Sequence, residues 1–226
     1  MARNAAVDHD KKVAVFSLEM TTRSLILRLL ALEAKVDLST LRSGFLPQYS
    51  RDKLALAASN LSQAEIWIDD SGTATILEIK AKCRRLKAER GLDLVMLDYL
   101  QLASADGPRD RKDLEIAEIS RGLKNLAREL QVPIIAVSQL NRALEQRQDK
   151  RPMLGDLRES GAIEQDSDIV MFIYRDEYYF PEKVESKGIA EVVIAKHRQG
   201  GVGKVDMTFL PEFTLFADMG RAEAPM

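Results

Sequence analysis

A chain of 226 residues, with 46% hydrophobic and 30% charged residues, suits one α/β domain, and we interpret residues 1–226 as a single domain. One cysteine, Cys83, and two histidines argue against a disulfide framework and against a zinc site built from cysteine and histidine. No apolar run is long enough to span a membrane and the N-terminus is too polar for a signal peptide, so we expect a cytoplasmic protein without membrane contacts. The net charge is −2, so binding of nucleic acid would need a local basic patch.

Up to about residue 140 the chain alternates short apolar runs with amphipathic stretches. Runs such as residues 13–18 predict buried strands, and apolar residues three and four apart, as at Ile76, Ile79 and Cys83, predict helices. The predicted strands cover residues 13–18, 66–69, 93–98 and 133–138, and the predicted helices cover about 21–35, 54–64, 76–86 and 116–130. Strands that alternate with helices favour a parallel sheet flanked by helices.

After residue 140 the pattern changes. Residues 140–168 are polar and rich in turn formers, which predicts short helical pieces at most. Four strands then follow without helices between them, at residues 168–175, 189–197, 204–210 and 213–217. This succession predicts antiparallel strands that extend the same sheet, followed by a disordered tail at 218–226.

Three predicted strands end in polar side chains. Glu19 follows strand 13–18, Asp98 ends strand 93–98, and Gln139 follows strand 133–138. Ligands of open α/β sheets bind at the carboxyl ends of strands, so neighbouring strands would bring these groups together. The trio suits phosphoryl transfer to water: Asp98 would hold Mg²⁺, directly or through water, Glu19 would accept a proton from the attacking water, and Gln139 would sense the γ-phosphate or orient water. Each residue alone is more simply a helix cap or a polar loop residue.

A phosphate site of this kind also needs a loop of the pattern G-x-x-x-x-G-K-[ST]. The nearest match is RQGGVGKV at residues 198–205. Arg198 stands at the first glycine, Val205 replaces the Mg²⁺-binding hydroxyl, and the segment lies between two predicted strands. We therefore reject it as a phosphate cradle and expect a glycine-rich hairpin turn.

Five segments in order resemble the C-terminal motor domain of DnaB-type replicative helicases. They are VAVFSLEM, LDLVMLDYLQL, IIAVSQLNRALEQRQDKRP, DLRESGAIEQDSDIVMFIYRDEYY and IAEVVIAKHR. The resemblance covers about residues 5–217. The resemblance implies a RecA-like fold of the P-loop NTPase type, ATP and Mg²⁺ as cofactors, and a homo-hexameric ring around single-stranded DNA. It also names primase and a helicase loader as candidate partners.

The resemblance implies a role for each matching residue. Glu19 corresponds to the catalytic carboxylate, Asp98 to the Mg²⁺-linked Walker B acid and Gln139 to the γ-phosphate sensor. Lys196 and Arg198 correspond to the pair that reaches the ATP of the neighbouring subunit, with Arg198 as arginine finger.

The DNA-gripping loop of the ring channel corresponds to Arg158, Glu159 and Gly161. Backbone N–H groups and one arginine can hold phosphates there without reading bases. This binding would not depend on the base sequence.

Two features depart from the family pattern. Gln199–Gly203 replaces the usual N-G-P-T-G, which leaves the shape of that turn open. The family's P-loop would come immediately before Ala5, so we expect residues 1–12 to be the remnant of the helix after it, in a chain that lacks the P-loop and the family's N-terminal domain. The missing strand belongs in the middle of the sheet, and its loss would expose strand edges and apolar surface.

The sequence therefore favours an ATP-driven DNA helicase motor that is inactive as given, for want of the P-loop. Two alternatives stay open. One is a non-catalytic RecA-like module that forms rings or binds DNA, and the other is a related RecA-like recombination ATPase.

Overall fold

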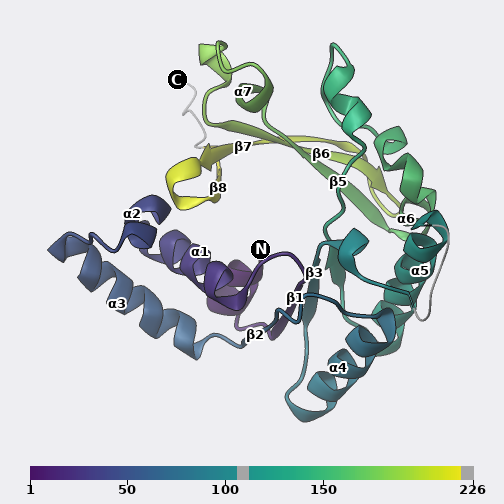
Figure 1. The fold of residues 1–226 in the computed structure, drawn as a ribbon, viewed down its shortest axis with the longest axis horizontal. Helices are drawn as coiled ribbons and strands as arrows, with labels where there is room; N and C mark the ends of the chain where they lie inside the picture. Colours follow the sequence, from purple (N-terminus) through teal and green to yellow (C-terminus); the bar gives the residue numbers. More distant parts are fainter. Residues whose placement is uncertain (106–111, 220–226) are drawn as a thin grey trace, which may run out of the picture.

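The computed structural model describes residues 1–105 and 112–219, except for the side chains of residues 112 and 158–160. The predicted tail at 218–226 falls mostly outside these ranges. Within the described part, two four-stranded sheets with their helices form a curved molecule (Figure 1).

The first sheet is parallel, as the alternating pattern predicts. Its order is β2-β1-β3-β4, with β1 next to β3 along its whole length, from Val13 opposite Leu94 to Ser17 opposite Asp98. The strands are β1 (Val13–Ser17), β2 (Ile66–Asp69), β3 (Leu94–Asp98) and β4 (Ile134–Ala136). Because β1, β3 and β4 are neighbours, their carboxyl ends meet at one edge of the sheet.

Helices cover both faces of this sheet (Figure 1). They are α1 (Thr22–Ala34), α2 (Leu38–Ser43), α3 (Gln48–Gln63), α4 (Ile76–Glu89) and α5 (Lys112–Leu130), and a short π-helical turn, η1 (Asn4–Asp8), precedes β1. Helix α4 begins at a capping box in which Thr75 and Glu78 satisfy each other's backbone N–H groups. Its apolar stripe and that of α5 bury Ile79, Leu97 and Ile119 completely, each contributing about 1.5–3 kcal/mol of transfer free energy.

The second sheet is antiparallel in the order β5-β6-β7-β8. Its strands are β5 (Ile169–Tyr174), β6 (Ile189–His197), β7 (Gly203–Leu210) and β8 (Leu215–Asp218). The elements around it are η3 (Arg142–Gln146), η4 (Leu154–Ser160), α6 (Gly161–Asp166), α7 (Asp176–Tyr179), η5 (Val184–Ser186) and η6 (Pro211–Phe213). Residues 198–202 turn between β6 and β7, which confirms the predicted hairpin, and a Cβ on Gly200 would lie 2.4 Å from the His197 ring.

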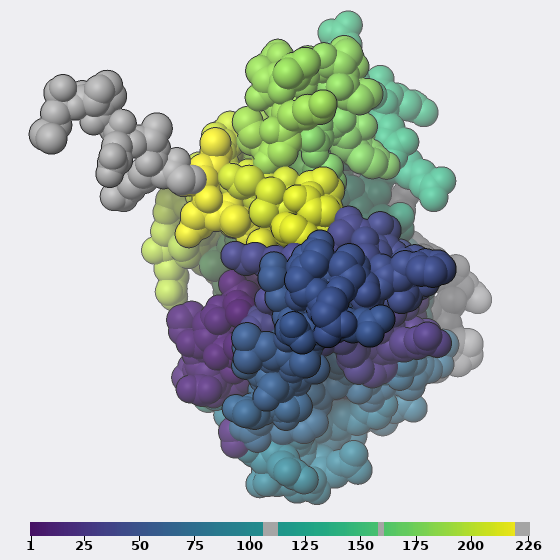
Figure 2. All heavy atoms as spheres, turned by 90° about the vertical axis from the view of Figure 1, so that its left-hand side faces the viewer, coloured from purple at the N-terminus to yellow at the C-terminus, as the bar shows by residue number. Residues whose placement is uncertain are grey.

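The prediction that the antiparallel strands extend the parallel sheet is wrong. Among the described strands β4 pairs only with β3 and β5 only with β6, so the two sheets are separate. Strand β4 is three residues long and offers only a short edge, whereas every residue of β5 is paired with β6. The two halves meet instead through helices, with α5 against α6 and η4. On the other side of the molecule η6 lies against α1 and α2 (Figure 2).

One face of β5 carries exposed apolar side chains. Along β5, buried and exposed residues alternate, and the exposed ones are large: Ile169, Met171 and Ile173, the last 60% exposed. Val137, just after β4, is exposed as well. No helix within residues 1–105 and 112–219 is long and apolar enough to cross a membrane.

Candidate functional site

The ends of β1, β3 and β4 place Glu19, Asp98 and Gln139 at one edge of the parallel sheet. Strands β1 and β3 stay together beyond their last paired residues, because the Leu18 N–H donates to the Asp98 carbonyl at 2.7 Å. Glu19 lies close enough to Asp98 for its negative charge to raise the pKa of the Asp98 carboxyl group. Gln139 follows β4, the next strand in the sheet.

A closed turn presents Glu19 to solvent. The buried Ser17 hydroxyl donates to the Met20 carbonyl at 2.8 Å and accepts from the Met20 N–H at 3.2 Å. This pair of bonds brackets Glu19, whose side chain is exposed. The arrangement leaves the Glu19 carboxylate free to accept a proton from a water molecule. Ser17 was not among the residues predicted from the sequence, although a serine that ends an apolar run two residues before an acid is a visible signal.

Asp98 is half-buried, and this burial raises the pKa of its carboxyl group. The negative charge of Glu19 raises the same pKa further, while the positive charge of Arg28 on α1 lowers it. Asp98 supplies hard oxygen ligands of the kind that Mg²⁺ prefers. Across the described residues there is no group of three or more histidine, cysteine, aspartate or glutamate side chains that could hold a metal. The donor set therefore fits a Mg²⁺ ion that phosphate oxygens also bind.

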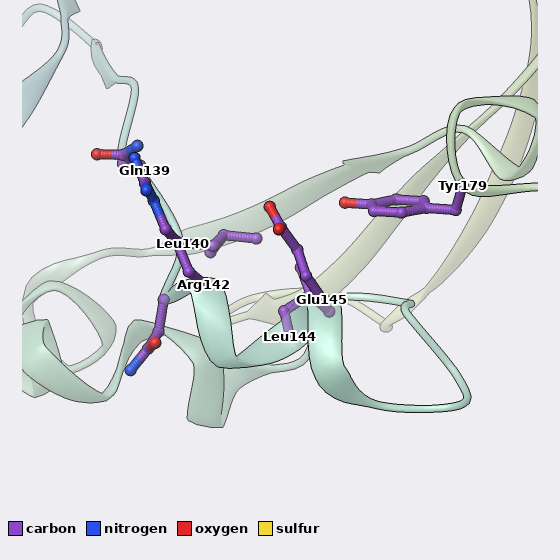
Figure 3. A pocket seen from close by; sticks show the side chains of 7 residues that line it. Gln139, Leu140, Arg142, Leu144, Glu145 and Tyr179 are labelled. Carbon is purple, nitrogen blue, oxygen red and sulfur yellow. The ribbon is translucent and has the colours of Figure 1, made fainter.

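Gln139 lies at the rim of a cavity of about 410 Å³ between the segment 139–145 and Tyr179 of α7. In Figure 3, Gln139 and Tyr179 lie at opposite ends of this cavity and Glu145 lies between them. The lining residues are Gln139, Leu140, Asn141, Arg142, Leu144, Glu145 and Tyr179. The position leaves the exposed Gln139 side chain room to contact a ligand.

Lys196 and Arg198 lie at the end of β6 and bind the C-terminal end of α6 in the same chain. The Lys196 ammonium donates to the carbonyls of Glu164 and of Ser167, the latter at 2.8 Å. The Arg198 guanidinium donates to the Gln165 carbonyl at 2.7 Å and lies 3.4 Å from the Asp168 carboxylate. The structure therefore groups these two cations with each other and with residues 164–168.

The three residues of the predicted DNA-gripping loop lie where η4 ends and α6 begins. Arg158 and Glu159 belong to η4, but their side chains are outside the described part. Gly161 is the first residue of α6 and is exposed. Both η4 and α6 pack against α5. The loop thus comes after Gln139 in the sequence and leads into α6, whose C-terminal end Lys196 and Arg198 bind.

The geometry of residues 198–205 is also unlike that of a phosphate cradle. Lys204, its lysine, lies in β7, where its ammonium is 3.0 Å from Asp206 and 3.6 Å from Glu191. The N–H groups of a β ladder point at neighbouring strands and do not converge on an anion. This lysine is therefore part of a charge cluster on the antiparallel sheet.

Comparisons with known proteins agree with the fold and with the motifs. A family model described as the DnaB-like helicase C terminal domain matches residues 1–218. The chain is 50% identical over 222 residues to the replicative DNA helicase DnaC of Bacillus subtilis (strain 168), an alignment that covers 98% of this chain and 49% of that protein. It is 49% identical over 222 residues to the replicative DNA helicase DnaB of Geobacillus stearothermophilus, with the same coverage. The chain thus spans about half the length of these relatives.

Solved structures give the same result. One, titled as a DnaB-like replicative helicase and its interactions with primase, superposes with a TM-score of 0.92 at 42% identity over 96% of this chain and 52% of that one. Another, titled as an ATPase domain, gives a TM-score of 0.91 at 43% identity over 96% of this chain and 78% of that one. Such agreement over nearly the whole chain confirms the RecA-like fold class. The chain belongs to the DnaB-like helicase C-terminal domain family.

Proposed function

We propose that this chain is the motor domain of a replicative DNA helicase, which couples ATP hydrolysis to movement along single-stranded DNA and to unwinding of the duplex. One observation carries the proposal: this chain, which belongs to the DnaB-like helicase C-terminal domain family, brings Glu19, Asp98 and Gln139 to one edge of its parallel sheet. That edge is where open α/β sheets bind their ligands. The acid, the base and the amide supply the groups that phosphoryl transfer to water requires.

Each residue has a separate task in the proposed reaction. Asp98 would hold Mg²⁺, directly or through water, and the ion would supply charge neutralisation at the phosphate oxygens. Glu19 orients the attacking water and accepts its proton. Gln139 contacts the γ-phosphate from the neighbouring strand. Positioning and electrostatic stabilisation account for most of the catalysis in such a reaction, so the rigid strand ends are as important as the groups themselves.

Lys196 and Arg198 complete the site in the proposed homo-hexameric ring. Lys196 lies in β6 of the antiparallel sheet and Arg198 follows that strand, whereas Asp98 ends β3 of the parallel sheet and Glu19 follows β1. An exposed guanidinium on a separate sheet is suited to stabilise transition-state charge in a neighbouring subunit. In the isolated chain the two cations are held by the end of α6 instead.

Single-stranded DNA is the proposed track, held at Arg158, Glu159 and Gly161 in the channel of the ring. Contacts to phosphates without base readout suit a motor that must pass every sequence. Primase and a helicase loader are the proposed protein partners, and a cytoplasmic location is proposed for the assembly.

The leading alternative is a non-catalytic RecA-like module that packs into a ring or binds DNA. The observation that favours it is the lack of a G-x-x-x-x-G-K-[ST] motif within these 226 residues. Without the N–H cradle and its lysine, the β- and γ-phosphates have no dedicated binding groups. A recombination ATPase is the weaker alternative, because the relatives named above are replicative helicases.

One experiment separates these functions. It uses an extended protein, defined as this chain preceded by a strand, a G-x-x-x-x-G-K-T loop and the start of a helix. The extended protein should hydrolyse ATP, faster with single-stranded DNA, and should unwind a forked duplex. Glu19→Gln should lower turnover on the order of 10²–10⁴-fold, as expected for a lost general base. Glu182→Gln, an exposed carboxylate on another part of the surface, is the matched control.

Calorimetry with ATP and Mg²⁺ tests the chain without the extension. We expect no binding in the micromolar range to these 226 residues and clear binding to the extended protein. Micromolar binding to the chain itself, abolished in Lys204→Ala, would contradict this expectation and would make GGVGK a substitute cradle. An extended protein that binds DNA but turns over no ATP would favour the non-catalytic module.

A further inference from the structure

One side chain, Gln101, holds the backbone of Gln139 from both sides. Its amide nitrogen donates to the Gln139 carbonyl at 3.1 Å and to the Ser138 hydroxyl at 2.9 Å. Its amide oxygen accepts from the Gln139 N–H at 3.2 Å. The carboxamide of Gln101 therefore pairs with both polar groups of the Gln139 peptide backbone, as a residue of a neighbouring strand would.

The backbone that carries Gln101 is itself firmly anchored. Gln101 is the middle residue of η2 (Leu100–Leu102), a 3₁₀ turn that begins two residues after Asp98. Leu100 is 2% exposed in the main core, and its N–H donates to the Val137 carbonyl at 2.9 Å. Gln101 thus has a fixed starting point, set by the same strand that ends at Asp98.

The need for this contact follows from where the ladder of β4 ends. Paired residues stop at Leu97 opposite Ala136. Val137 follows with two more backbone bonds, from its N–H to the Leu97 carbonyl at 2.9 Å and to its carbonyl from the Leu100 N–H at 2.9 Å. Gln139 lies beyond that point and is exposed. An exposed residue past the end of a strand has many accessible φ and ψ values unless something restrains it. Gln101 provides that restraint through its two hydrogen bonds to the backbone of Gln139.

We propose that Gln101 is a positioning residue for ATP hydrolysis: it fixes the backbone of Gln139, and so the direction of the Gln139 side chain, relative to Asp98. The inference rests on the proposed role of Gln139 as γ-phosphate sensor. It adds a residue that has no contact with the nucleotide but connects the metal-binding strand end to the sensor strand end. A loose sensor would bind ATP with little loss yet reach the reactive geometry rarely, so turnover should fall more than affinity.

The kinetic test uses Gln101→Met in the extended protein, because methionine keeps the length of the side chain and removes all three hydrogen bonds. We expect kcat to fall on the order of tenfold to a hundredfold, with KM for ATP changed less than about threefold, since misplaced groups lose rate more than binding. Gln63→Met, at the exposed end of α3, is the matched control and should change neither constant. If Gln101→Met folds poorly, Gln101→Asn shortens the side chain by one methylene, breaks the same contacts and is judged by the same criteria.

A double-mutant cycle with Gln139→Ala separates positioning from general damage. If Gln101 acts through Gln139, adding Gln101→Met to Gln139→Ala should cost less than about twofold further in kcat. Full additivity of the two losses would overturn the inference. If Gln139→Ala lowers kcat but Gln101→Met does not, the inference fails while the proposed function stands. If Gln139→Ala itself leaves kcat unchanged, the sensor role fails, and the inference fails with it.

Amide hydrogen exchange tests the clamp in the chain as it is, without nucleotide. Gln101→Met should speed exchange of the Gln139 amide on the order of tenfold or more, because its hydrogen-bond acceptor is gone. The Val137 amide, which bonds to the Leu97 carbonyl, should keep its protection and serves as the internal control. Unchanged protection at Gln139 would show that its N–H does not depend on Gln101, and the inference would be wrong.

Discussion

Arg198→Ala has two effects that differ in size, and the structure allows them to be separated. In the folded chain the mutation removes one hydrogen bond to the Gln165 carbonyl and one ion pair with Asp168, at 3.4 Å, from a side chain that is 44% exposed. An exposed pair of this kind contributes less than about 1 kcal/mol and the hydrogen bond about 1 kcal/mol. For a domain of this size each kcal/mol shifts Tm by about 2–4 °C, so the fold should survive.

The effect on catalysis should be much larger. Removal of an arginine finger costs on the order of 10³ in turnover, or about 4 kcal/mol of transition-state stabilisation. In the extended protein we therefore expect kcat to fall by that factor, ATP binding by calorimetry to stay nearly unchanged, and the melting temperature to drop only a few degrees. Arg51→Ala on the exposed face of α3 controls for the loss of a surface arginine.

Mixed rings test whether Arg198 acts across a subunit boundary. When Arg198→Ala and Glu19→Ala subunits share rings at equal amounts, about a quarter of the interfaces join an intact Glu19 to an intact Arg198 of the next subunit. Activity should then recover in proportion. Rings shown to contain both subunits but to remain inactive would refute the assignment in trans, because a finger acting within its own subunit gains nothing from mixing.

Three further predictions concern the DNA loop, the metal-binding acid and the charge cluster. Arg158→Ala should weaken binding of poly-dT and of mixed single strands alike and reduce the salt dependence of binding, whereas a loss confined to one sequence would indicate base readout. The raised pKa of Asp98 means that the charged form of this carboxyl group costs folding stability above that pKa. Asp98→Asn should therefore raise Tm near neutral pH, and the gain should vanish as the pH falls below the ordinary carboxyl range. An unchanged Tm near neutral pH would contradict this expectation. Arg151→Met should cost about 1.5–3 kcal/mol in urea unfolding near neutral pH, because it leaves the buried Glu191 carboxylate without its two-pronged partner. The Arg151 hydrogen bond lowers the pKa of Glu191, so this contribution should be lost as the pH falls through that lowered pKa, and equal losses at neutral and acid pH would disprove the assignment.

Local pattern in the sequence was enough for most of the elements and for the parallel arrangement of the first sheet. The helix predicted over about residues 21–35 spans Thr22–Ala34, and the strand at 66–69 has the predicted bounds. Such signals are local, since caps and apolar spacing act within a few residues. Helix α2 was missed, because its six residues are too few to show a helical period.

Some residues of the candidate site could likewise be predicted from the sequence, and others could not. Glu19, Asp98 and Gln139 stand out in the sequence because each follows an apolar run, and the carboxyl ends of parallel strands lie on one edge. Gln101 does not stand out, since a glutamine between two leucines has no local signature. Its contact with Gln139 joins residues 38 positions apart and depends on β3 and β4 being neighbours.

The arrangement of the two sheets was decided only by the tertiary structure. Alternation of apolar and polar residues identifies β5 to β8 as strands, but it does not say which edges pair, because a strand presents the same N–H and C=O groups to any neighbour. In the structure β5 pairs with β6, and the halves meet through α5 with α6 and through η6 with α1 and α2. The strand pattern is a property of nearby residues, whereas the pairing depends on which distant surfaces bury the most apolar area together.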